Sequence, residues 1–202
     1  MARARHDTGA DRAGNEGTGM KYFNDRIEMV AALVKPGSTG AEIGVAQGVF
    51  SASLLHCSPA KLYLVDSWKK YDGYSHEAVF NDDNHERNFG IVLGRFNDAI
   101  HAKQVEIIRG FSVDAALTMG DRRLDWFYLD ANHQYEFVFT DLVVWSLYLK
   151  PDGFIMGHDY IVRPEENFGV IGAVHEFCAR FDWEVEYLTQ DGVMSYALRK
   201  LP

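Results

Sequence analysis

The chain has 202 residues, which is enough for one domain with a full hydrophobic core. Hydrophobic residues make up 47% of the chain and charged residues 24%, as is typical of a soluble globular protein, and no apolar run is long enough to span a bilayer. The net charge of −9 argues against a nucleic-acid partner, because proteins that bind a phosphate backbone usually carry a basic stripe.

The N-terminal segment, residues 1–19, is rich in Arg, Ala, Gly and Asp and has no apolar period. We expect it to be a disordered tail, with a lid that orders over a ligand as the alternative, and we expect residues 20–202 to form a single domain. The segment does not resemble an apolar signal, and Cys57 and Cys178 are isolated thiols outside any metal-ligand spacing. These features predict a cytoplasmic protein.

The first predicted helix begins near Tyr22 and ends at Lys35-Pro36-Gly37. Its apolar residues at helical spacing are Phe23, Ile27, Val30 and Val34. A short apolar strand then ends at residues 42–44, and a turn of small residues leads into a second helix near Val49. This alternation of helices and strands predicts an α/β fold.

The turn of small residues carries Gly44 and Gly48, which permit a tight backbone and the close approach of a ligand. Because the spacing is Gly-x-x-x-Gly and not the Gly-x-Gly-x-x-Gly of dinucleotide binders, it favours a nucleoside without a bridging diphosphate. The next strand, residues 61–65, leads to Asp66, which could hold a ribose diol or simply terminate the strand. Trp68 could cover an adenine or pack in the core.

Residues 69–88 combine polar and aromatic side chains with little apolar period. They predict a loop with at most a helical turn, which either recognises a substrate or is a solvated connector. A helix is predicted to return from Phe89. The third strand, residues 105–109, leads to Gly110-Phe111-Ser112, whose backbone could contact an adenine edge, and Ser112 is the predicted N-cap of a short helix.

The fourth predicted strand, residues 124–129, ends in an aromatic and apolar run typical of a strand that is buried on both faces. Asp130 follows it, and His133 lies three residues later. In open α/β sheets ligands bind at the carboxyl ends of the strands, where a carboxylate and an imidazole could bind a metal and move a proton. The alternative, that Asp130 caps the next helix and His133 lies in its first turn, fits this stretch equally well.

The fifth predicted strand, residues 154–156, follows an amphipathic helix and leads to His158 and Asp159. If the two strands are parallel neighbours, these residues join Asp130 and His133 at one edge of the sheet. Asp130 and Asp159 are then the preferred ligands for a hard cation such as Mg²⁺, whereas His158 would suit Mn²⁺ or Zn²⁺ better. Any one of these residues alone would more often be structural.

The C-terminal part predicts a helix over residues 169–181 and then strands over 183–188 and 195–198, joined by an Asp191-Gly192 turn. This order of elements resembles the class I S-adenosylmethionine-dependent methyltransferase fold. The resemblance implies a Rossmann-like α/β fold with a seven-stranded, mostly parallel sheet, a C-terminal antiparallel hairpin and helices on both faces. Residues 42–48 resemble the first motif of that family, and Asp66 matches its ribose-binding acid.

Three further segments, residues 129–136, 149–153 and 157–160, are similar to small metal-dependent O-methyltransferases. That subgroup includes enzymes that act on macrolide sugars and aminocoumarin antibiotics, together with cephalosporin hydroxylase-like proteins. The resemblance implies that S-adenosylmethionine is held by Glu42, Gly44, Ala46, Gly48, Ser51, Asp66, Ser67, Trp68, Gly110, Phe111, Ser112 and Asp130.

The resemblance also assigns the chemistry. It implies that Asp130 and the pair His158-Asp159 bind magnesium or another divalent metal, and that His133 is the general base. The sugar-methylating relatives tend to have two acids where this chain has His158-Asp159, so the identity of the metal does not carry over. The expected function is O-methylation of a small-molecule hydroxyl, on a sugar or another natural product.

Two other functions are compatible with these patterns. A nucleotide-dependent oxidoreductase would share the glycine turn and the ribose acid, although it would usually have the dinucleotide spacing. A catalytically inactive cofactor-binding module would keep the pocket without the chemistry. The oligomeric state is open, and a homo-oligomer is compatible with the sequence.

Overall fold

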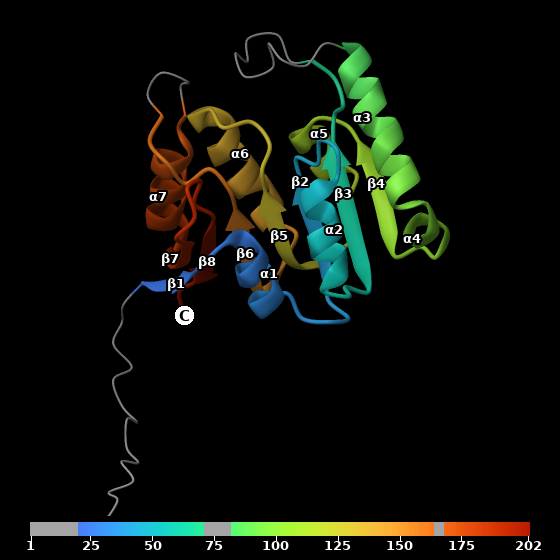
Figure 1. The fold of residues 1–202 in the computed structure, drawn as a ribbon. Coiled ribbons are helices and arrows are strands. Elements are labelled where there is room, and N and C mark those ends of the chain that lie inside the picture. The colour runs from blue at the N-terminus through green and yellow to red at the C-terminus, as the bar shows by residue number, and fades with distance from the viewer. Residues whose placement is uncertain (1–19, 71–81, 164–167) are drawn as a thin grey trace, which may run out of the picture.

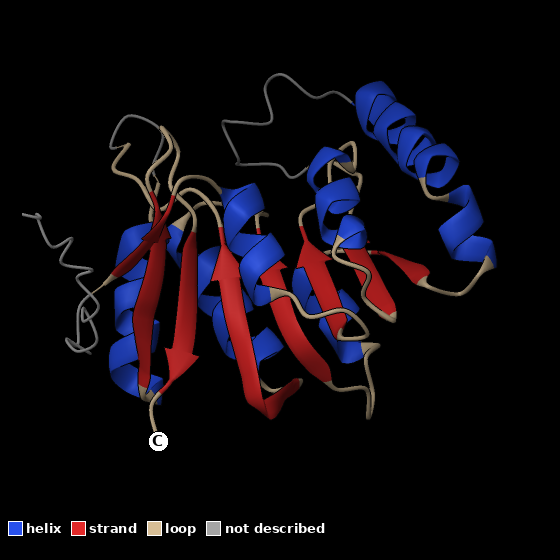
Figure 2. Cartoon of the chain, turned by 60° about the horizontal axis from the view of Figure 1, so that its bottom comes forward, coloured by secondary structure: helices blue, strands red, loops and turns tan. Residues whose placement is uncertain are grey.

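The computed structural model describes residues 20–70, 82–163 and 168–202 (Figure 1). The tail expected at residues 1–19 lies outside these ranges, as do residues 71–81 of the expected loop. The described chain forms one mixed sheet with helices on both of its faces (Figure 2).

The sheet has eight strands, one more than the seven expected, in the order β1-β7-β8-β6-β5-β2-β3-β4. Their bounds are Lys21–Phe23 (β1), Thr39–Ile43 (β2), Lys61–Asp66 (β3), Val105–Arg109 (β4), Leu124–Leu129 (β5), Leu149–Gly157 (β6), Trp183–Thr189 (β7) and Tyr196–Lys200 (β8). Among the described strands only β8 runs antiparallel, against both β6 and β7. The expected fold class, a mostly parallel sheet with a C-terminal antiparallel hairpin, is therefore confirmed.

The helices cover the sheet in two layers. Their bounds are Arg26–Leu33 (α1), Val49–His56 (α2), Asp82–Arg95 (α3), Asn97–His101 (α4), Ser112–Leu117 (α5), Tyr135–Ser146 (α6) and Val170–Phe181 (α7). Buried residues of α1, α2 and α3 form the core on one face, and those of α5, α6 and α7 form the core on the other. Within the described ranges, none of these helices is both long and apolar enough to cross a membrane.

The central strands contribute side chains to both cores. In β5, Phe127 and Leu129 belong to the core beneath α5, α6 and α7, whereas Trp126 and Tyr128 belong to the opposite core. Successive side chains of a strand point to opposite faces, so a strand covered on both sides must be apolar at consecutive positions. This is the physical origin of the apolar run that precedes Asp130.

The N-terminal edge of the sheet differs from the expectation. The helix predicted to begin near residue 22 begins at Arg26, and Asp25 caps it by accepting hydrogen bonds from two backbone amides at 2.8 and 2.9 Å. Before it, β1 pairs in parallel with β7, and the ring of Phe23 stacks on that of Tyr187 at a centroid distance of 5.3 Å. Phe23 therefore belongs to the edge of the sheet and not to the first helix.

Two other helix boundaries were wrong. Residues 82–88, expected in a loop, form the first half of α3, which runs for 14 residues. The predicted N-cap Ser112 is instead the first residue of α5, and Phe111 holds the cap position without a side-chain hydrogen bond. The Ser112 hydroxyl is used differently, since it accepts a hydrogen bond from Trp145 Nε1 at 2.8 Å.

Candidate active site

The parallel strands β5 and β6 bring two acids to one edge of the sheet. Asp130 directly follows β5, and its backbone N–H donates to the carbonyl of Ile43 in β2 at 2.8 Å. Asp159 lies two residues beyond β6 and has a left-handed backbone with φ +57°. A non-glycine residue in this conformation is held there by its surroundings, and such residues concentrate at functional sites.

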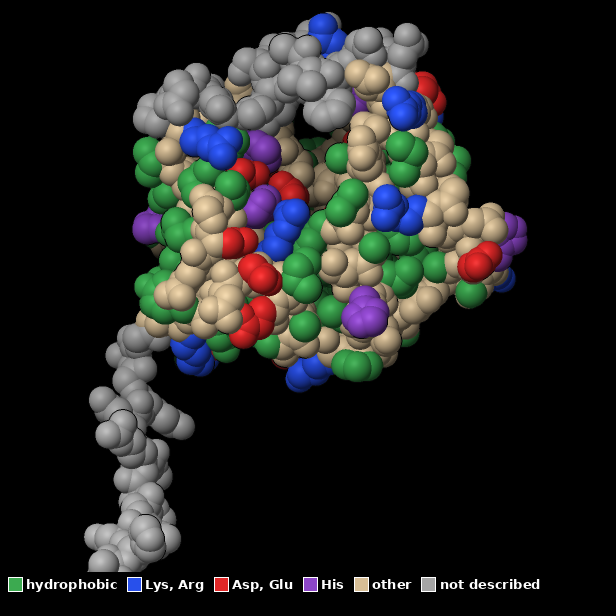
Figure 3. Space-filling view, viewed as in Figure 1, with side chains coloured by type: hydrophobic (Ala, Val, Ile, Leu, Met, Phe, Trp, Pro, Cys, Tyr) green, Lys and Arg blue, Asp and Glu red, His purple; other side chains and the backbone are tan. Residues whose placement is uncertain are grey.

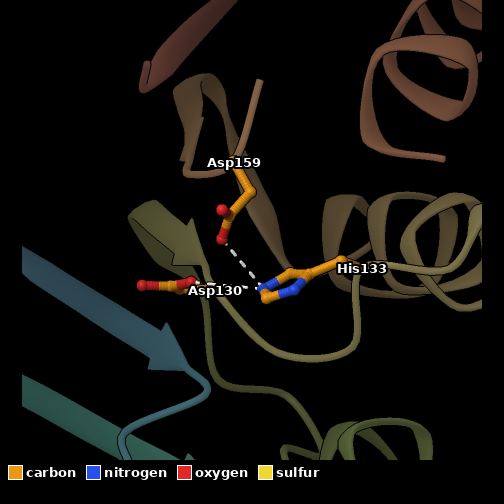
Figure 4. Close-up of side chains that lie close together, drawn as sticks. All are labelled: Asp130, His133 and Asp159. Atoms are coloured by element: carbon orange, nitrogen blue, oxygen red, sulfur yellow. Dashed lines mark ion pairs between the residues drawn. The ribbon is translucent and has the colours of Figure 1, made fainter. Parts of the chain in front are cut away.

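His133 lies between the two acids (Figure 4). Its Nε2 atom is 2.9 Å from Asp159 Oδ2 and 3.6 Å from Asp130 Oδ1. One ligand atom from each of the three residues lies within 4.8 Å of the others, and they form a group able to hold a metal ion among the described residues. The structure thus brings Asp130, His133 and Asp159 together, as the argument from strand ends predicted.

The charges in this group are mutually dependent. Burial lowers the pKa of His133, but hydrogen bonds and charges from Asp130 and Asp159 outweigh burial and raise it to about 9. Burial acts in the opposite direction on Asp159, whose pKa is nevertheless held below its ordinary value by the hydrogen bond and charge of His133. Near neutral pH His133 is therefore mostly an imidazolium.

The predicted ligand His158 lies apart from this group. Its Nδ1 is 2.9 Å from the Ser195 hydroxyl, which is itself 2.9 Å from the hydroxyl of Tyr128. Ser195 and Tyr128 are fully buried, so this chain of hydrogen bonds fixes one face of the His158 ring from inside the protein. Only Nε2 of His158 is left to meet a ligand.

Arg26 reaches the same edge of the sheet from α1. Its Nη1 atom is 3.4 Å from Asp130 Oδ2, and its guanidinium lies over the ring of Phe50, 4.5 Å from the centroid. Arg26 is not among the predicted site residues, because nothing in the sequence near position 26 indicates a contact with a residue 104 positions away. Within the described part of the chain, the positive charge of Arg26 faces the Oδ2 atom of Asp130.

The glycine turn after β2 is shaped by close packing. Gly44 has φ +93°, and a Cβ atom there would lie 2.0 Å from the carbonyl oxygen of Asp130, so only glycine fits. Asp66 closes the turn from β3, since one of its carboxylate oxygens accepts hydrogen bonds from the backbone N–H groups of Val45 and Ala46, both at 2.9 Å. The turn is therefore preformed and tied to both neighbouring strands.

Two polar groups beneath this turn have unmet hydrogen-bonding capacity. Glu42 is 1% exposed and Ser51 is fully buried, and Glu42 Oε2 and Ser51 Oγ have no hydrogen-bond partner within the described part of the chain. Burial is the main reason why the pKa of Glu42 is raised well above its ordinary value. Buried polar atoms left unsatisfied are costly, so this pair indicates a place for a polar ligand group or a water molecule.

A cavity of about 440 Å³ opens beside the Gly44 turn, and its volume is within the range of small-molecule sites. Most of the predicted cofactor residues line it, namely Gly44, Ala46, Asp66, Ser67, Trp68, Gly110, Phe111, Ser112 and Asp130. Glu42, Gly48 and Ser51 lie outside its lining, and His133 belongs to it. Figure 3 shows acidic, histidine and basic side chains gathered beside a hollow in the upper part of the molecule.

Trp68 contributes to the wall of this cavity from the core side. It is 1% exposed, and its Nε1 donates to the carbonyl of Ala46 at 2.9 Å. Its ring packs against that of Phe89 with the centroids 4.9 Å apart. Of the two roles considered for Trp68, packing in the core is the one that these contacts describe.

Comparison with known proteins identifies the fold and the family. A family model described as "Methyltransferase domain" matches residues 41–160. No curated protein matches the chain. Similar solved structures include an O-methyltransferase from Bacillus cereus in complex with SAH, which is 14% identical with a TM-score of 0.63 over 87% of this chain and 80% of that one.

Two further solved structures have the same fold. The O-methyltransferase NovP is 21% identical with a TM-score of 0.61, over 88% of this chain and 80% of that one. A putative rRNA-methylase from Clostridium thermocellum is 14% identical with a TM-score of 0.63, over 87% and 93%. At these identities the structures support the fold alone, and the family model carries the assignment.

Proposed function

Since this chain belongs to the methyltransferase domain family, we propose that it transfers a methyl group from S-adenosylmethionine to a hydroxyl of a small molecule. In this proposal a divalent metal binds at Asp130 and Asp159, and His133 is the general base. The observation that carries the proposal is the convergence of these three side chains, two of which, Asp130 and His133, line a cavity bordered by the glycine turn.

The residues around the cavity fit the cofactor. S-adenosylmethionine supplies a methyl group on a positively charged sulfur, next to a nucleoside and an amino-acid end. The Gly44 turn borders the cavity, and most of the predicted cofactor residues line it. Asp66 is the last residue of the next strand, β3, and we propose that it also meets the ribose.

The group Asp130, His133 and Asp159 also fits a metal. Two carboxylates are the donors that Mg²⁺ prefers. His158 lies outside this group, and its Nε2 atom is kept in the proposal as a further candidate ligand. When bound, a divalent cation would lower the pKa of an acceptor hydroxyl and orient it. Arg26 would remain as a fixed positive charge on the far side of Asp130.

His133 has to lose its proton before it can accept one. With a pKa of about 9 it is mostly protonated at neutral pH, because two carboxylates stabilise its positive charge. Any positive charge shared by Asp130 and Asp159 would weaken that stabilisation and favour the neutral imidazole. The ring, held between the two acids, would then take the hydroxyl proton as the methyl group is transferred.

The negative charge of the chain supports a small-molecule acceptor. A net charge of −9 and an acidic cavity mouth would repel a nucleic-acid backbone, even though one similar structure bears the name of an rRNA-methylase. A sugar, a phenol or a polyketide hydroxyl fits the proposal. We also propose a cytoplasmic location, since Cys57 and Cys178 are both free thiols.

S-adenosylhomocysteine is expected to stabilise the protein and NAD is not. At a ligand concentration of about 100 times Kd, the stabilisation of roughly 3 kcal/mol corresponds to a rise in Tm of roughly 5–10 °C. Thermal unfolding with each ligand in turn measures the difference. A larger shift with NAD would favour the nucleotide-dependent oxidoreductase, and a shift with S-adenosylhomocysteine but no methyl transfer to any hydroxyl compound would favour the inactive module.

Calorimetric titration of Mg²⁺ into the protein saturated with S-adenosylhomocysteine is expected to show one site. Asp159→Asn removes one carboxylate charge from the proposed ligand set and should weaken the affinity about tenfold or more. Asp152→Asn makes the same change at an exposed acid in β6 and should leave the affinity unchanged. Equal affinities in all three proteins, or turnover that is indifferent to EDTA, would remove the metal from the proposal. His158→Ala tests the third candidate ligand in the same way.

A further inference from the structure

Helix α6 carries a carboxyl group on its buried side. The buried residues of α6 are Val138, Asp141, Leu142 and Trp145, which follow the spacing of an inward-facing helical stripe. Asp141 is 4% exposed, and it lines the same cavity as Asp130 and His133. An acid is rarely buried in this way without a partner, so its position requires an explanation.

The structure provides a rigid support for this carboxyl group. Trp145 Nε1 donates to the Ser112 hydroxyl oxygen at 2.8 Å, which leaves the hydroxyl hydrogen free to be donated in turn. Burial raises the pKa of Asp141 to about 7, and a hydrogen bond from Ser112 opposes that rise. Ser112 can therefore satisfy one oxygen of the carboxyl group, and Asp141 itself lines the cavity.

The sheet order places Asp141 at a particular end of the cavity. The strands that border the cavity run in the order β5-β2-β3-β4, with Asp130 after β5 and Asp66 at the end of β3. Ser112 follows β4, so its contact with Asp141 lies at the end farthest from Asp130. A nucleoside with its ribose at Asp66 and its reacting group at Asp130 would direct its base to this end.

The same end of the cavity offers apolar surface. Phe111 and Val113 line it and are 44% and 38% exposed. A planar base would cover this surface and bring its polar edge toward the interior. The buried Asp141 and the half-buried Ser112 are polar side chains that such an edge could meet there.

We propose that Asp141 recognises the adenine of the cofactor by accepting a hydrogen bond from the exocyclic 6-amino group. An ionised carboxylate accepts from that group, and a neutral carboxyl group can also donate to the neighbouring ring nitrogen, N1. Both forms of Asp141 therefore bind adenine. The inference deepens the proposed function, on which it rests for the identity of the cofactor. It does not depend on the metal or on the general base.

The test is a thermodynamic cycle between Asp141 and the amino group of the ligand. The two ligands are S-adenosylhomocysteine and its analogue in which hydrogen replaces the 6-amino group, and their affinities are measured by calorimetry without metal or acceptor. The wild type is expected to bind the analogue roughly 10- to 100-fold more weakly, as for a hydrogen bond to a charged group. Asp141→Ala is expected to bind both ligands equally, within about twofold.

Glu136→Ala is the matched control, because it removes an exposed acid from the same helix and should keep the full preference of the wild type. Asp141→Leu fills the volume of the lost carboxyl group, and it replaces the alanine variant if thermal unfolding shows that the latter does not fold. The inference is overturned if the wild type binds both ligands equally, or if the Asp141 variants keep the preference. Failure of the wild type to bind S-adenosylhomocysteine at all would overturn the cofactor assignment as well, which separates the two outcomes.

Discussion

Turnover of His133→Ala is expected to be about two to four orders of magnitude below that of the wild type, while S-adenosylhomocysteine still binds. The imidazole of His133 lies between Asp130 and Asp159, where its neutral form can accept a proton. Its Nε2 atom is 2.9 Å from Asp159 Oδ2. Turnover is measured as formation of S-adenosylhomocysteine, with the acceptor that the wild type uses best from a panel of phenols and sugars with vicinal hydroxyls.

A loss of turnover could also arise from two carboxylates left facing each other, so the experiment needs a readout specific to proton transfer. Imidazole added to the buffer should restore part of the activity of His133→Ala, because it can enter the space that the side chain vacates. His56→Ala removes an exposed histidine at the end of α2 and should behave as the wild type. Unchanged turnover in His133→Ala would exclude His133 as the general base. Failure of imidazole to restore activity would favour a structural role for His133.

The convergence of Asp130, His133 and Asp159 could be predicted from local sequence patterns and one rule of sheet topology. The rule is that neighbouring parallel strands end at the same edge of a sheet. The apolar runs of β5 and β6 mark strands that are buried on both faces. Parallel neighbours end at the same edge, so Asp130 and Asp159 had to approach each other once β5 and β6 paired. No knowledge of loop conformation was needed for that step, which is why it was correct.

Long-range contacts could not be predicted in this way. Arg26, the first residue of α1, meets Asp130 across 104 positions. β1 has only three residues, of which two are exposed, and it exists because β7 offers it an edge. Short elements of this kind have no periodicity of their own, and tertiary pairing decides them.

Asp141 is a different case, because the signal was present in the sequence. Asp141 occupies an inward position of the amphipathic helix that begins at Tyr135. The other buried residues of this helix are Val138, Leu142 and Trp145. A charged residue within a buried stripe contradicts the pattern of its neighbours, and such conflicts concentrate at functional sites. The apolar positions of this helix predict its buried face, and Asp141 lies within that face.

Gly44→Ala is expected to lower the free energy of unfolding by about 2–5 kcal/mol and to weaken cofactor binding at the same time. A Cβ at this position would lie 2.0 Å from the Asp130 carbonyl oxygen, and a side chain at φ +93° is strained. Relief requires the end of β5 to move away from β2, which breaks the hydrogen bond from Asp130 N to Ile43 O. Urea unfolding measures the stability, and calorimetry with S-adenosylhomocysteine measures the binding.

Gly37→Ala separates the two causes of this loss. Gly37 has φ +78°, and a Cβ there would meet nothing within 4 Å, so its substitution introduces the backbone strain without the collision. It should cost about 1–2 kcal/mol and leave S-adenosylhomocysteine binding unchanged, since Gly37 is remote from the cavity mouth. The difference between the two variants is then the free energy that depends on close contact between β2 and β5. Equal losses would mean that the strand ends can separate without cost, and that the position of Asp130 is set elsewhere.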